Sequence, residues 1–369
     1  VYEIREGAGQ DFGPAAAYDL VEGWLDSDRF RVLLDRSGAI TSLVDHQLFN
    51  IEFVDYVLGR WMNDLGGLGG DALVAENVGP VSVTLVARSD SPVQHTTRVT
   101  VYREGGRVDV RNEITQNFSD VQTWGFGFMC DTPTVRHEEV GAILTARLAS
   151  EGGHYSDRAV NSRYDWLTLG HFVDMSGDFA SGLTVSNADC QFFRLGTSDL
   201  DHLDTTTPAL EIVAGGDIAG GGTPGVRDQG GDSYFLQRFA LAPHAEYDPA
   251  QALRVSLEHT NPLVCGPVTG GAPTLPSDSF SAVTVSDPNV LLWSFKPAEE
   301  GVLEGFIARL WNVTDAPRAT TLQLAPAPIV SAWRTTHIET DEEQLLLGPA
   351  GLEADFTSQQ VRTFRLRLQ

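Results

Sequence analysis

Residues 81–89 (VSVTLVARS), 95–104 (HTTRVTVYRE) and 107–116 (RVDVRNEITQ) decide the fold class of this chain. Apolar and polar residues alternate in each segment, and Gly105 and Gly106 separate the last two. Such alternation is typical of a β-strand that buries one face and exposes the other. The three segments therefore predict antiparallel strands in a sheet with one buried face.

The same pattern continues on both sides of this stretch. RFRVLLD (29–35) and AITSLVDHQ (39–47) flank a turn at Ser37 and Gly38, which predicts a hairpin. Further strand-like segments follow beyond residue 166, and no sustained apolar stripe with a helical period occurs. The chain is therefore predicted to be all-β, with the short strand spacing of sandwiches.

Length and composition predict more than one β unit. A chain of 369 residues exceeds the usual size of one domain, and PVTGGAPTLPS (267–277) has the composition of a linker. We predict a lead-in segment at 1–28 that continues from a preceding region, a large β domain at 29–266 and a smaller β-sandwich domain at 267–369.

Charge and cysteine content limit the partners and the compartment. The formal net charge of −25 opposes binding to nucleic acid, and no apolar run approaches the roughly 20 residues that span a membrane. The scattered acidic residues suggest a halophilic or high-GC prokaryotic source. Cys130, Cys190 and Cys265 lie far apart, which favours buried thiols over disulfides or a zinc site. They favour a reducing compartment such as the cytoplasm.

Residue patterns for catalysis or metal binding are weak. The acidic pairs are adjacent in sequence, so in strands they point to opposite faces and are expected in solvent; they are Glu138–Glu139, Glu299–Glu300 and Glu342–Glu343. His202 and Asp204 lie in a polar segment without a third ligand, which favours a surface loop. We therefore predict no catalytic residue and no metal site within this chain.

Aromatic and glycine-rich stretches allow two interpretations each. Trp124, Phe126 and Phe128 alternate with glycine and fit either a sugar-stacking surface or a sheet core, and the core is favoured. DLGGLGGDA (64–72) lacks the frame of a phosphate-binding loop and predicts a flexible surface loop. Single histidines near aromatics, such as His171 and His154, fit acid–base work on a sugar or a structural role.

The stretch from Arg227 to Leu263 is the most informative for function. It follows a glycine-rich segment, continues as an apolar pattern typical of a strand and ends with an Asn-Pro pair. This composition predicts a loop that feeds a β-strand at the surface, where a binding site could form.

Four groups of short motifs occur along the chain in a fixed order. They are FRV, ITSL and Asp45 near the start; Trp166, FVDMS and GLTVSN at 166–187; DQG, Phe235, LAPH and NPL at 228–263; and, from Ser279 to Thr363, Val285, NV, KP, RLW and RT. Together they resemble the β-rich C-terminal half of family 38 glycoside hydrolases, the α-mannosidases. The resemblance implies a galactose-mutarotase-like β-supersandwich followed by a smaller β-sandwich.

The resemblance also implies where the chemistry lies. In that family the zinc ligands and the nucleophilic aspartate belong to an α/β domain that is absent from this chain. No cofactor is therefore expected here, and zinc is expected in the absent catalytic domain. The implied partners are carbohydrate, such as mannosides, and a catalytic α/β domain in the same or another chain.

Five residues are carbohydrate-facing candidates. Loops of the family's β half approach the active-site cleft, so by analogy Arg227, Asp228 and Asp232 lie at its edge; Asp232 stands where the family usually has histidine. Trp166 and His171 join them as an aromatic and a histidine that could meet a sugar.

The function implied is that of the C-terminal β portion of a family-38-like α-mannosidase, which binds carbohydrate and acts as a scaffold for the catalytic domain. Two alternatives stay open, a stand-alone carbohydrate-binding module and a mutarotase- or lyase-like enzyme on the same fold. Whether the chain is itself an enzyme is also open, because the zinc and nucleophile motifs are absent from it.

Overall fold

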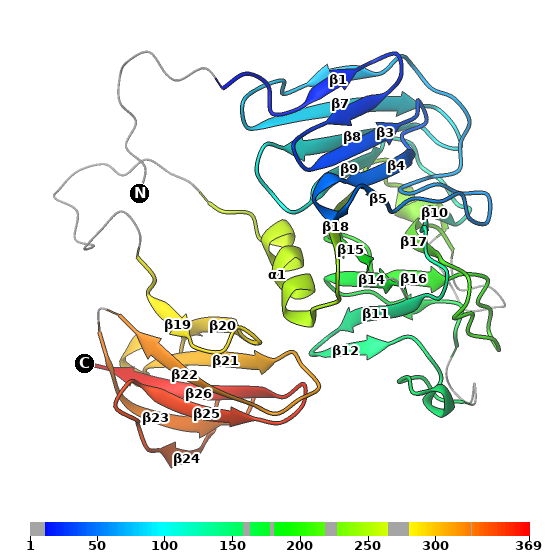
Figure 1. Cartoon of the computed structure of the whole chain (residues 1–369). Helices are drawn as coiled ribbons and strands as arrows, with labels where there is room; N and C mark the ends of the chain where they lie inside the picture. The colour runs from blue at the N-terminus through cyan, green and yellow to red at the C-terminus, as the bar shows by residue number, and fades with distance from the viewer. Residues whose placement is uncertain (1–11, 158–162, 178–180, 218–226, 265–279, 326) are drawn as a thin grey trace.

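The computed structural model describes residues 12–157, 163–177, 181–217, 227–264, 280–325 and 327–369 (Figure 1). Within these residues the chain folds into five sheets, and the strand pairs are antiparallel. The prediction of an all-β chain with a large sandwich followed by a smaller one is confirmed. None of the helices in this part of the chain is long and apolar enough to cross a membrane.

Three sheets build the large sandwich. The five-stranded sheet contains β1 (Ala17–Asp19), β2 (Trp24–Asp26), β3 (Phe30–Leu34), β4 (Ile40–Asp45) and β5 (Ile51–Glu52). The nine-stranded sheet contains β12 (Ala142–Thr145), β11 (Thr134–Glu139), β14 (Phe172–Ser176), β15 (Gly182–Asn187), β18 (Phe235–His244), β9 (Val108–Ile114), β8 (His95–Tyr102), β7 (Ser82–Ser89) and β6 (Val74–Glu76), in that order. The four-stranded sheet contains β10 (Gln122–Gly127), β17 (Ala209–Gly215), β16 (Phe192–Leu195) and β13 (Leu167–Thr168).

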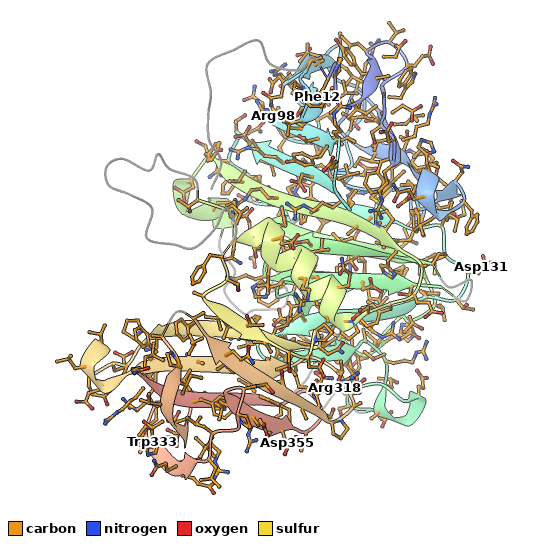
Figure 2. All side chains as sticks on the ribbon, turned by 60° about the vertical axis from the view of Figure 1, so that its left-hand side comes forward. Phe12, Arg98, Asp131, Arg318, Trp333 and Asp355 are labelled. Carbon is orange, nitrogen blue, oxygen red and sulfur yellow. The ribbon has the colours of Figure 1, made fainter. Side chains whose placement is uncertain are left out.

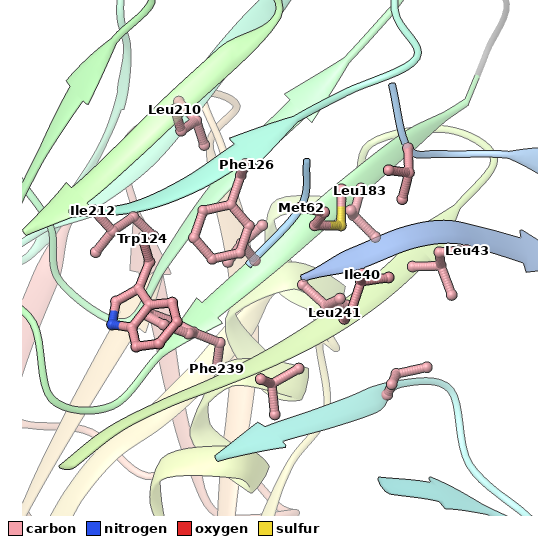
Figure 3. Packing of buried hydrophobic residues seen from close by; sticks show 14 of the residues in the cluster. Ile40, Leu43, Met62, Trp124, Phe126, Leu183, Leu210, Ile212, Phe239 and Leu241 are labelled. Atoms are coloured by element: carbon pink, nitrogen blue, oxygen red, sulfur yellow. The ribbon is translucent and has the colours of Figure 1, made fainter. Parts of the chain in front are cut away.

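The core of the large sandwich lies between the nine-stranded sheet and the two smaller sheets. Figure 3 shows Ile40 of β4 and Trp124 of β10 packed near Phe239 of β18. The aromatic stripe of β10 is core, as favoured from its sequence, because Trp124 and Phe126 are fully buried and Phe128 nearly so. Since side chains alternate along each strand, the second face of the nine-stranded sheet is left for other contacts.

The predicted hairpin at residues 29–45 is confirmed as β3 and β4. Gly38 in its turn has a φ of 95°, a conformation that disfavours other residues. An added Cβ at Gly38 would lie 2.6 Å from Thr97 Oγ1 of β8. Glycine is therefore needed both for the turn and for its close approach to the nine-stranded sheet.

Residues 249–260 form a helix, α1 (Pro249–Thr260), that the sequence interpretation missed. The strand expected in this stretch is present as β18, but the chain then turns at Asp248. The Asp248 carboxylate accepts hydrogen bonds from the backbone N–H groups of Ala250 and Gln251 and so caps the helix. Figure 2 shows α1, in yellow-green, lying across the strands of the large sandwich.

The smaller sandwich follows α1. One sheet contains β19 (Val283–Val285), β22 (Arg318–Leu324) and β25 (Leu352–Phe356). The other contains β20 (Val290–Pro297), β21 (Phe306–Asn312), β26 (Val361–Leu368), β23 (Ile329–Thr335) and β24 (Asp341–Leu345). Short 3-10 helices lie at His46–Leu48 (η1), Ala149–Glu151 (η2), Arg227–Gly231 (η3) and Val302–Glu304 (η4). This C-terminal sandwich has its own apolar core, which includes Leu310, Leu322 and Phe364.

A third apolar cluster joins the two sandwiches through α1. Leu253 of α1 packs in one cluster with Phe172 of β14 and Trp311 of β21. Figure 1 shows α1 between the strands of the large sandwich and those of the smaller one. The predicted linker at 267–277 lies outside the described residues. Strands β1 and β2 fall within the predicted lead-in segment and extend the sheet of β3. The exact domain limits stay a prediction.

Candidate functional site

Several loops gather at one end of the nine-stranded sheet. Ile114, the last residue of β9, pairs with both His95 at the start of β8 and Phe235 at the start of β18. The segments before β8, after β9 and before β18 therefore meet at the same end of the sheet. The loop before β18 is fastened there, since the Tyr234 hydroxyl donates to Glu113 at 2.7 Å.

A polar pocket of about 270 Å³ opens at this end of the sheet. The glycine-rich loop contributes Gly70 and Asp71, the end of β7 contributes residues 88–90, and residues 94–96 and Thr115 complete the wall. We call it the loop-end pocket.

The glycine-rich loop is packed rather than projecting freely. An added Cβ at Gly67 would lie 1.8 Å from the carbonyl oxygen of Ser91, and one at Gly70 would lie 2.0 Å from that of Arg36. No side chain fits at these distances, so the two glycines allow the loop to close against its neighbours. The loop lies at the surface, as predicted, with Leu68 92% exposed, and it also forms a wall of the pocket. Its predicted flexibility stays a prediction.

His95 forms a rigid part of the pocket lining. It is buried, with Nδ1 2.7 Å from the Val93 carbonyl oxygen and Nε2 2.9 Å from that of Ser37. The His95 ring meets the Trp124 ring edge-on, with 5.9 Å between the two ring centroids. Both ring nitrogens thus face backbone carbonyl oxygens, which fix the imidazole in the pocket wall.

The remaining side chains offer hydrogen bonds at the rim. Gln94 Nε2 donates to Asp90 at 3.4 Å, and Thr115 Oγ1 donates to Gln94 Oε1 at 3.1 Å. Asp71 is exposed beside them. Carboxylate, amide and hydroxyl groups so placed can bond the hydroxyls of a neutral polar ligand.

Asp232 lies in the loop before β18, at the loop end of the sheet. Its side chain is exposed, its N–H donates to Gln229, and its carbonyl oxygen accepts from the Asn117 side chain. Arg227 and Asp228 begin η3, but their side chains lie outside the described part of the structure. Their proposed place at a cleft edge stays a prediction.

Trp166 lies in a different part of the molecule. It precedes β13 at the edge of the four-stranded sheet, and the Arg194 guanidinium lies 5.2 Å from its ring centroid. Arg194 in turn pairs with Glu211 of β17. The indole therefore takes part in a surface cation–π contact, and its role toward carbohydrate stays a prediction.

His171 lies at the junction with the C-terminal sandwich. Its N–H and Nδ1 lie 2.8 Å and 3.0 Å from a Glu138 carboxylate oxygen, and its ring meets Trp293 of β20 at 5.4 Å. Glu138 is only 2% exposed, so its expected place in solvent is wrong. The His171–Glu138 pair therefore lies where the large sandwich packs against the C-terminal sandwich.

Sequence reasoning missed two further buried polar contacts. Asp174 of β14 is fully buried and accepts hydrogen bonds from Ser176, Thr184 and His244. Ser186 of β15 lies 2.8 Å from Nδ1 of His259 in α1. One feature of the sequence could have predicted these contacts. Polar residues occupy alternate positions in the two apolar strands FVDMS and GLTVSN, and they mark the face that α1 covers.

The His202–Asp204 segment is a surface loop, as predicted, but it is not exposed throughout. His202 is exposed, but Asp204 is buried and organises its own loop through hydrogen bonds from Thr197, Thr206 and Thr207. Although burial acts to raise it, these hydrogen bonds hold the pKa of Asp204 well below its usual value. Within the described residues, no group of three or more His, Cys, Asp or Glu side chains could hold a metal ion.

Comparison with protein families gives a match in the C-terminal sandwich. Residues 289–364 match the glycosyl hydrolases family 38 C-terminal beta sandwich domain. A comparison with curated protein sequences gave no match. The resemblance predicted from the sequence motifs is therefore confirmed for this part of the chain.

Solved structures extend the similarity to the whole fold. The chain is similar to an alpha-mannosidase from Enterococcus faecalis V583 (12% identity, TM-score 0.69) and to a protein in the Glycosyl Hydrolase Family 38 from Enterococcus faecalis (12% identity, TM-score 0.70). Each match covers 98% of this chain but 43% and 46% of those chains. This chain thus spans less than half the length of either protein.

A galactose mutarotase-like protein from Lactobacillus casei ATCC 334 also matches, with 12% identity and a TM-score of 0.36. That match covers 60% of this chain and 99% of the other. At these identities the likeness to the two Enterococcus faecalis structures concerns the fold.

Proposed function

We propose that this chain is the C-terminal β portion of a family-38-type α-mannosidase, in which it binds carbohydrate and supports a catalytic α/β domain. The observation that carries the proposal is the match of residues 289–364 to that family's C-terminal sandwich. The similarity of 98% of the chain to less than half of two longer proteins supports the same conclusion.

The proposed division of labour places bond cleavage outside this chain. Zinc would be held by the α/β domain, as the resemblance to the family implies. The β portion would supply one wall of the substrate cleft at its loop end. Asp71 and Gln94 of the loop-end pocket would accept and donate hydrogen bonds to sugar hydroxyls, and Asp232 would lie on the neighbouring loop.

Two packing features support a binding role for the loop-end pocket. Its glycine loop closes on the backbone of Arg36 and Ser91, and His95 is held by two carbonyl oxygens. A preformed wall reduces the ordering cost of binding. Polar groups on that wall can then contribute to affinity.

Carbohydrate binding is tested by hydrogen–deuterium exchange with methyl α-D-mannopyranoside. We expect slower exchange at residues 66–72 and 88–96 in the wild-type chain. The affinity should fall about tenfold in Asp71→Ala or Gln94→Ala. Glu353→Ala, on the C-terminal sandwich, is the control and should bind as the wild type does. Unchanged exchange in these two segments at saturating sugar would contradict the binding role.

The scaffold role is tested in the gene that encodes this sequence. We expect it, or an adjacent gene, to encode an α/β domain whose co-expression with this chain gives zinc-dependent hydrolysis of an aryl α-mannoside. The chain alone should give none, with or without added zinc. Turnover by the isolated chain would contradict the proposal, and sugar binding without any such α/β domain would favour the stand-alone module.

A further inference from the structure

A second hollow lies at the other end of the nine-stranded sheet, beside α1. Its wide part, of about 330 Å³, is lined by Tyr102, by the β8–β9 turn at 104–107 and by one side of α1. Its narrow part, of about 80 Å³, shares Gly106, Gln251 and Val255 with the wide part. These shared residues place the two parts side by side next to α1, and we call the two together the helix groove.

The helix groove is separate from the loop-end pocket. His95 lines the pocket and Tyr102 lines the groove, and these are the two ends of β8. A strand of this length spans roughly 25 Å at about 3.3 Å per residue. A ligand in one site therefore does not touch the other.

The narrow part of the groove ends on a fixed polar pair. Thr184 and His244 line it, and both bond the buried Asp174 carboxylate at 2.7 Å. The carboxylate is a hydrogen-bond acceptor here, so it holds the threonine hydroxyl and the imidazole in set orientations. A buried charge so arranged is costly to maintain for packing alone.

Two buried polar atoms in this region lack a protein partner. His244 Nδ1 and the Tyr247 hydroxyl have no hydrogen-bond partner among the described residues. The two rings lie 6.3 Å apart. Buried polar atoms of native proteins are nearly always bonded to protein or to a small polar molecule. Of the two residues, His244 lines the narrow part, where a hydroxyl group or water would supply its Nδ1 with a partner.

The wide part of the groove presents an oriented phenol and guanidinium. The Tyr102 hydroxyl donates to Asp109 at 2.9 Å, and Arg107 bonds the same carboxylate at 2.7 Å. Arg107 also reaches the Val255 carbonyl oxygen of α1 at 3.4 Å. The two side chains are therefore held in place, and Arg107 reaches from the β8–β9 turn to the helix.

The charges around the groove favour a neutral ligand over an anion. Four carboxylates line it against two guanidinium groups; they are Glu104, Glu246, Asp248 and Glu258 against Arg29 and Arg107. The excess of two negative charges repels carboxylates and phosphates. The same groups bond neutral hydroxyls as acceptors and donors.

We propose that the helix groove binds a neutral polyhydroxylated ring such as a pyranose. The ring lies in the wide part beside Tyr102 and Arg107, and one hydroxyl-bearing substituent enters the narrow part toward Thr184 and His244. The wide part has the size of a small-ligand pocket, for which about 300 Å³ is the lower bound. This site does not depend on the function proposed for the loop-end pocket.

Gly106→Phe is the test variant because it fills the point where the two parts meet. Gly106 needs no left-handed backbone, and an added Cβ would meet only Arg29 Nη1, at 3.2 Å. Gly79→Phe is the matched control, because a Cβ there meets only the Asn77 carbonyl oxygen, at 3.9 Å, and Gly79 lies outside the groove. Both variants add the same aromatic side chain at a glycine whose φ is not positive.

The probe is methyl α-D-mannopyranoside, followed by hydrogen–deuterium exchange at residues 102–107 and 246–258. We expect protection of both segments in the wild type and in Gly79→Phe, and an affinity about tenfold lower in Gly106→Phe. D-Glucuronate should bind about tenfold more weakly than the neutral sugar. Protection that persists in Gly106→Phe, or no protection at saturating sugar, would overturn the proposal.

A second variant keeps the test valid if Gly106→Phe does not fold. Gln251→Ala removes an amide from the exposed side of α1 where the two parts of the groove meet. It should lower the affinity about threefold or more without changing the circular dichroism spectrum. Unchanged affinity in folded Gln251→Ala would refute the site even if Gly106→Phe does not fold, whatever happens at residues 66–72.

Discussion

Ser186 and His259 join α1 to the nine-stranded sheet, with the serine hydroxyl 2.8 Å from the imidazole Nδ1. Ser186 is fully buried in β15, and His259 lies in the last turn of the helix. Within the sheet, His244 at the end of β18 bonds Asp174 of β14 at 2.7 Å. The last turn of α1 is therefore held by a histidine against the outer face of the large sandwich.

We expect acid to destabilise the chain through His259. Burial lowers the pKa of this imidazole from its usual 6.5 to about 4, and Arg107 and Arg238 act in the same direction against Asp109 and Asp189. Because the folded pKa lies below the unfolded one, the unfolded chain binds the proton more readily. The contribution of neutral His259 to the free energy of unfolding is fully present above pH 6.5. It is lost as the pH falls toward 4, and the loss reaches about 3 kcal/mol.

The measurement is the free energy of unfolding in urea between neutral pH and pH 4, for the wild type and His259→Gln. The variant should lose stability less steeply on acidification. His137, whose pKa burial also lowers to about 4, is present in both proteins and cancels in the difference. His202→Gln, at an exposed position, should follow the wild type. Equal slopes for the wild type and His259→Gln would show that this histidine does not titrate as expected.

Asp174→Asn should destabilise the chain by about 3 kcal/mol, because it removes the charge that pairs with His244 in a buried site. The amide nitrogen would also place donor hydrogens against one of the present donors, Ser176 in one orientation of the amide or Thr184 and His244 in the other. Equilibrium urea unfolding at neutral pH with an unchanged m-value measures the loss. Asp28→Asn, at an exposed position, should change stability by no more than about 0.5 kcal/mol. A loss below about 1 kcal/mol at Asp174 would mean that the carboxylate is dispensable to the fold.

The strands could be predicted from the sequence because their pattern is local. The period-two alternation at residues 81–116 requires no knowledge of distant segments, and it is present as β7, β8 and β9. The helix α1 was missed although Asp248 and Pro249 form a strong helix start. Its apolar face comprises little more than Ala250, Leu253 and Leu257, which is too short a pattern to recognise as a helical period.

Burial of polar residues could not be predicted, because it depends on which segments pack across a strand. Glu138 was expected in solvent, yet it is buried and bonded by His171, whose ring in turn packs on Trp293 of the C-terminal sandwich. Asp204 looked like part of a polar surface loop, but the hydroxyl and N–H groups of its neighbours enclose it. The loop-end pocket likewise combines segments that are far apart in sequence, from Gly70 to Thr115.

Gly38→Ala should destabilise the chain by about 3 kcal/mol, because the turn requires a positive φ and the new Cβ would lie 2.6 Å from Thr97 Oγ1. Gly152→Ala separates the two causes, since Gly152 also has a positive φ (83°) but no atom within 4 Å of the added Cβ. It should cost only about 1 kcal/mol. Urea unfolding of both variants gives the difference, and equal losses would show that the contact with Thr97 relaxes freely.

Leu253→Ala should weaken the junction between the two sandwiches. Leu253 is fully buried and packs with Phe172 of the large sandwich and Trp311 of the C-terminal sandwich. Truncating such a leucine leaves a cavity and costs about 2–5 kcal/mol. Leu303→Ala, at a residue 92% exposed in η4, is the matched control and should change stability by less than about 0.5 kcal/mol.

Scanning calorimetry shows whether Leu253 couples the two units or merely adds to their stability. Each sandwich has its own apolar core, so each can unfold by itself once the junction fails. We expect one transition in the wild type and two in Leu253→Ala, with the lower one accompanied by a change in tryptophan fluorescence from Trp293 and Trp311. Both indoles lie in the junction cluster, 5.2 Å apart, and would become exposed to water as it opens. A single transition merely shifted to lower temperature would mean that other contacts suffice to hold the units together, such as the paired hydrogen bonds between Gln359 and Ile143.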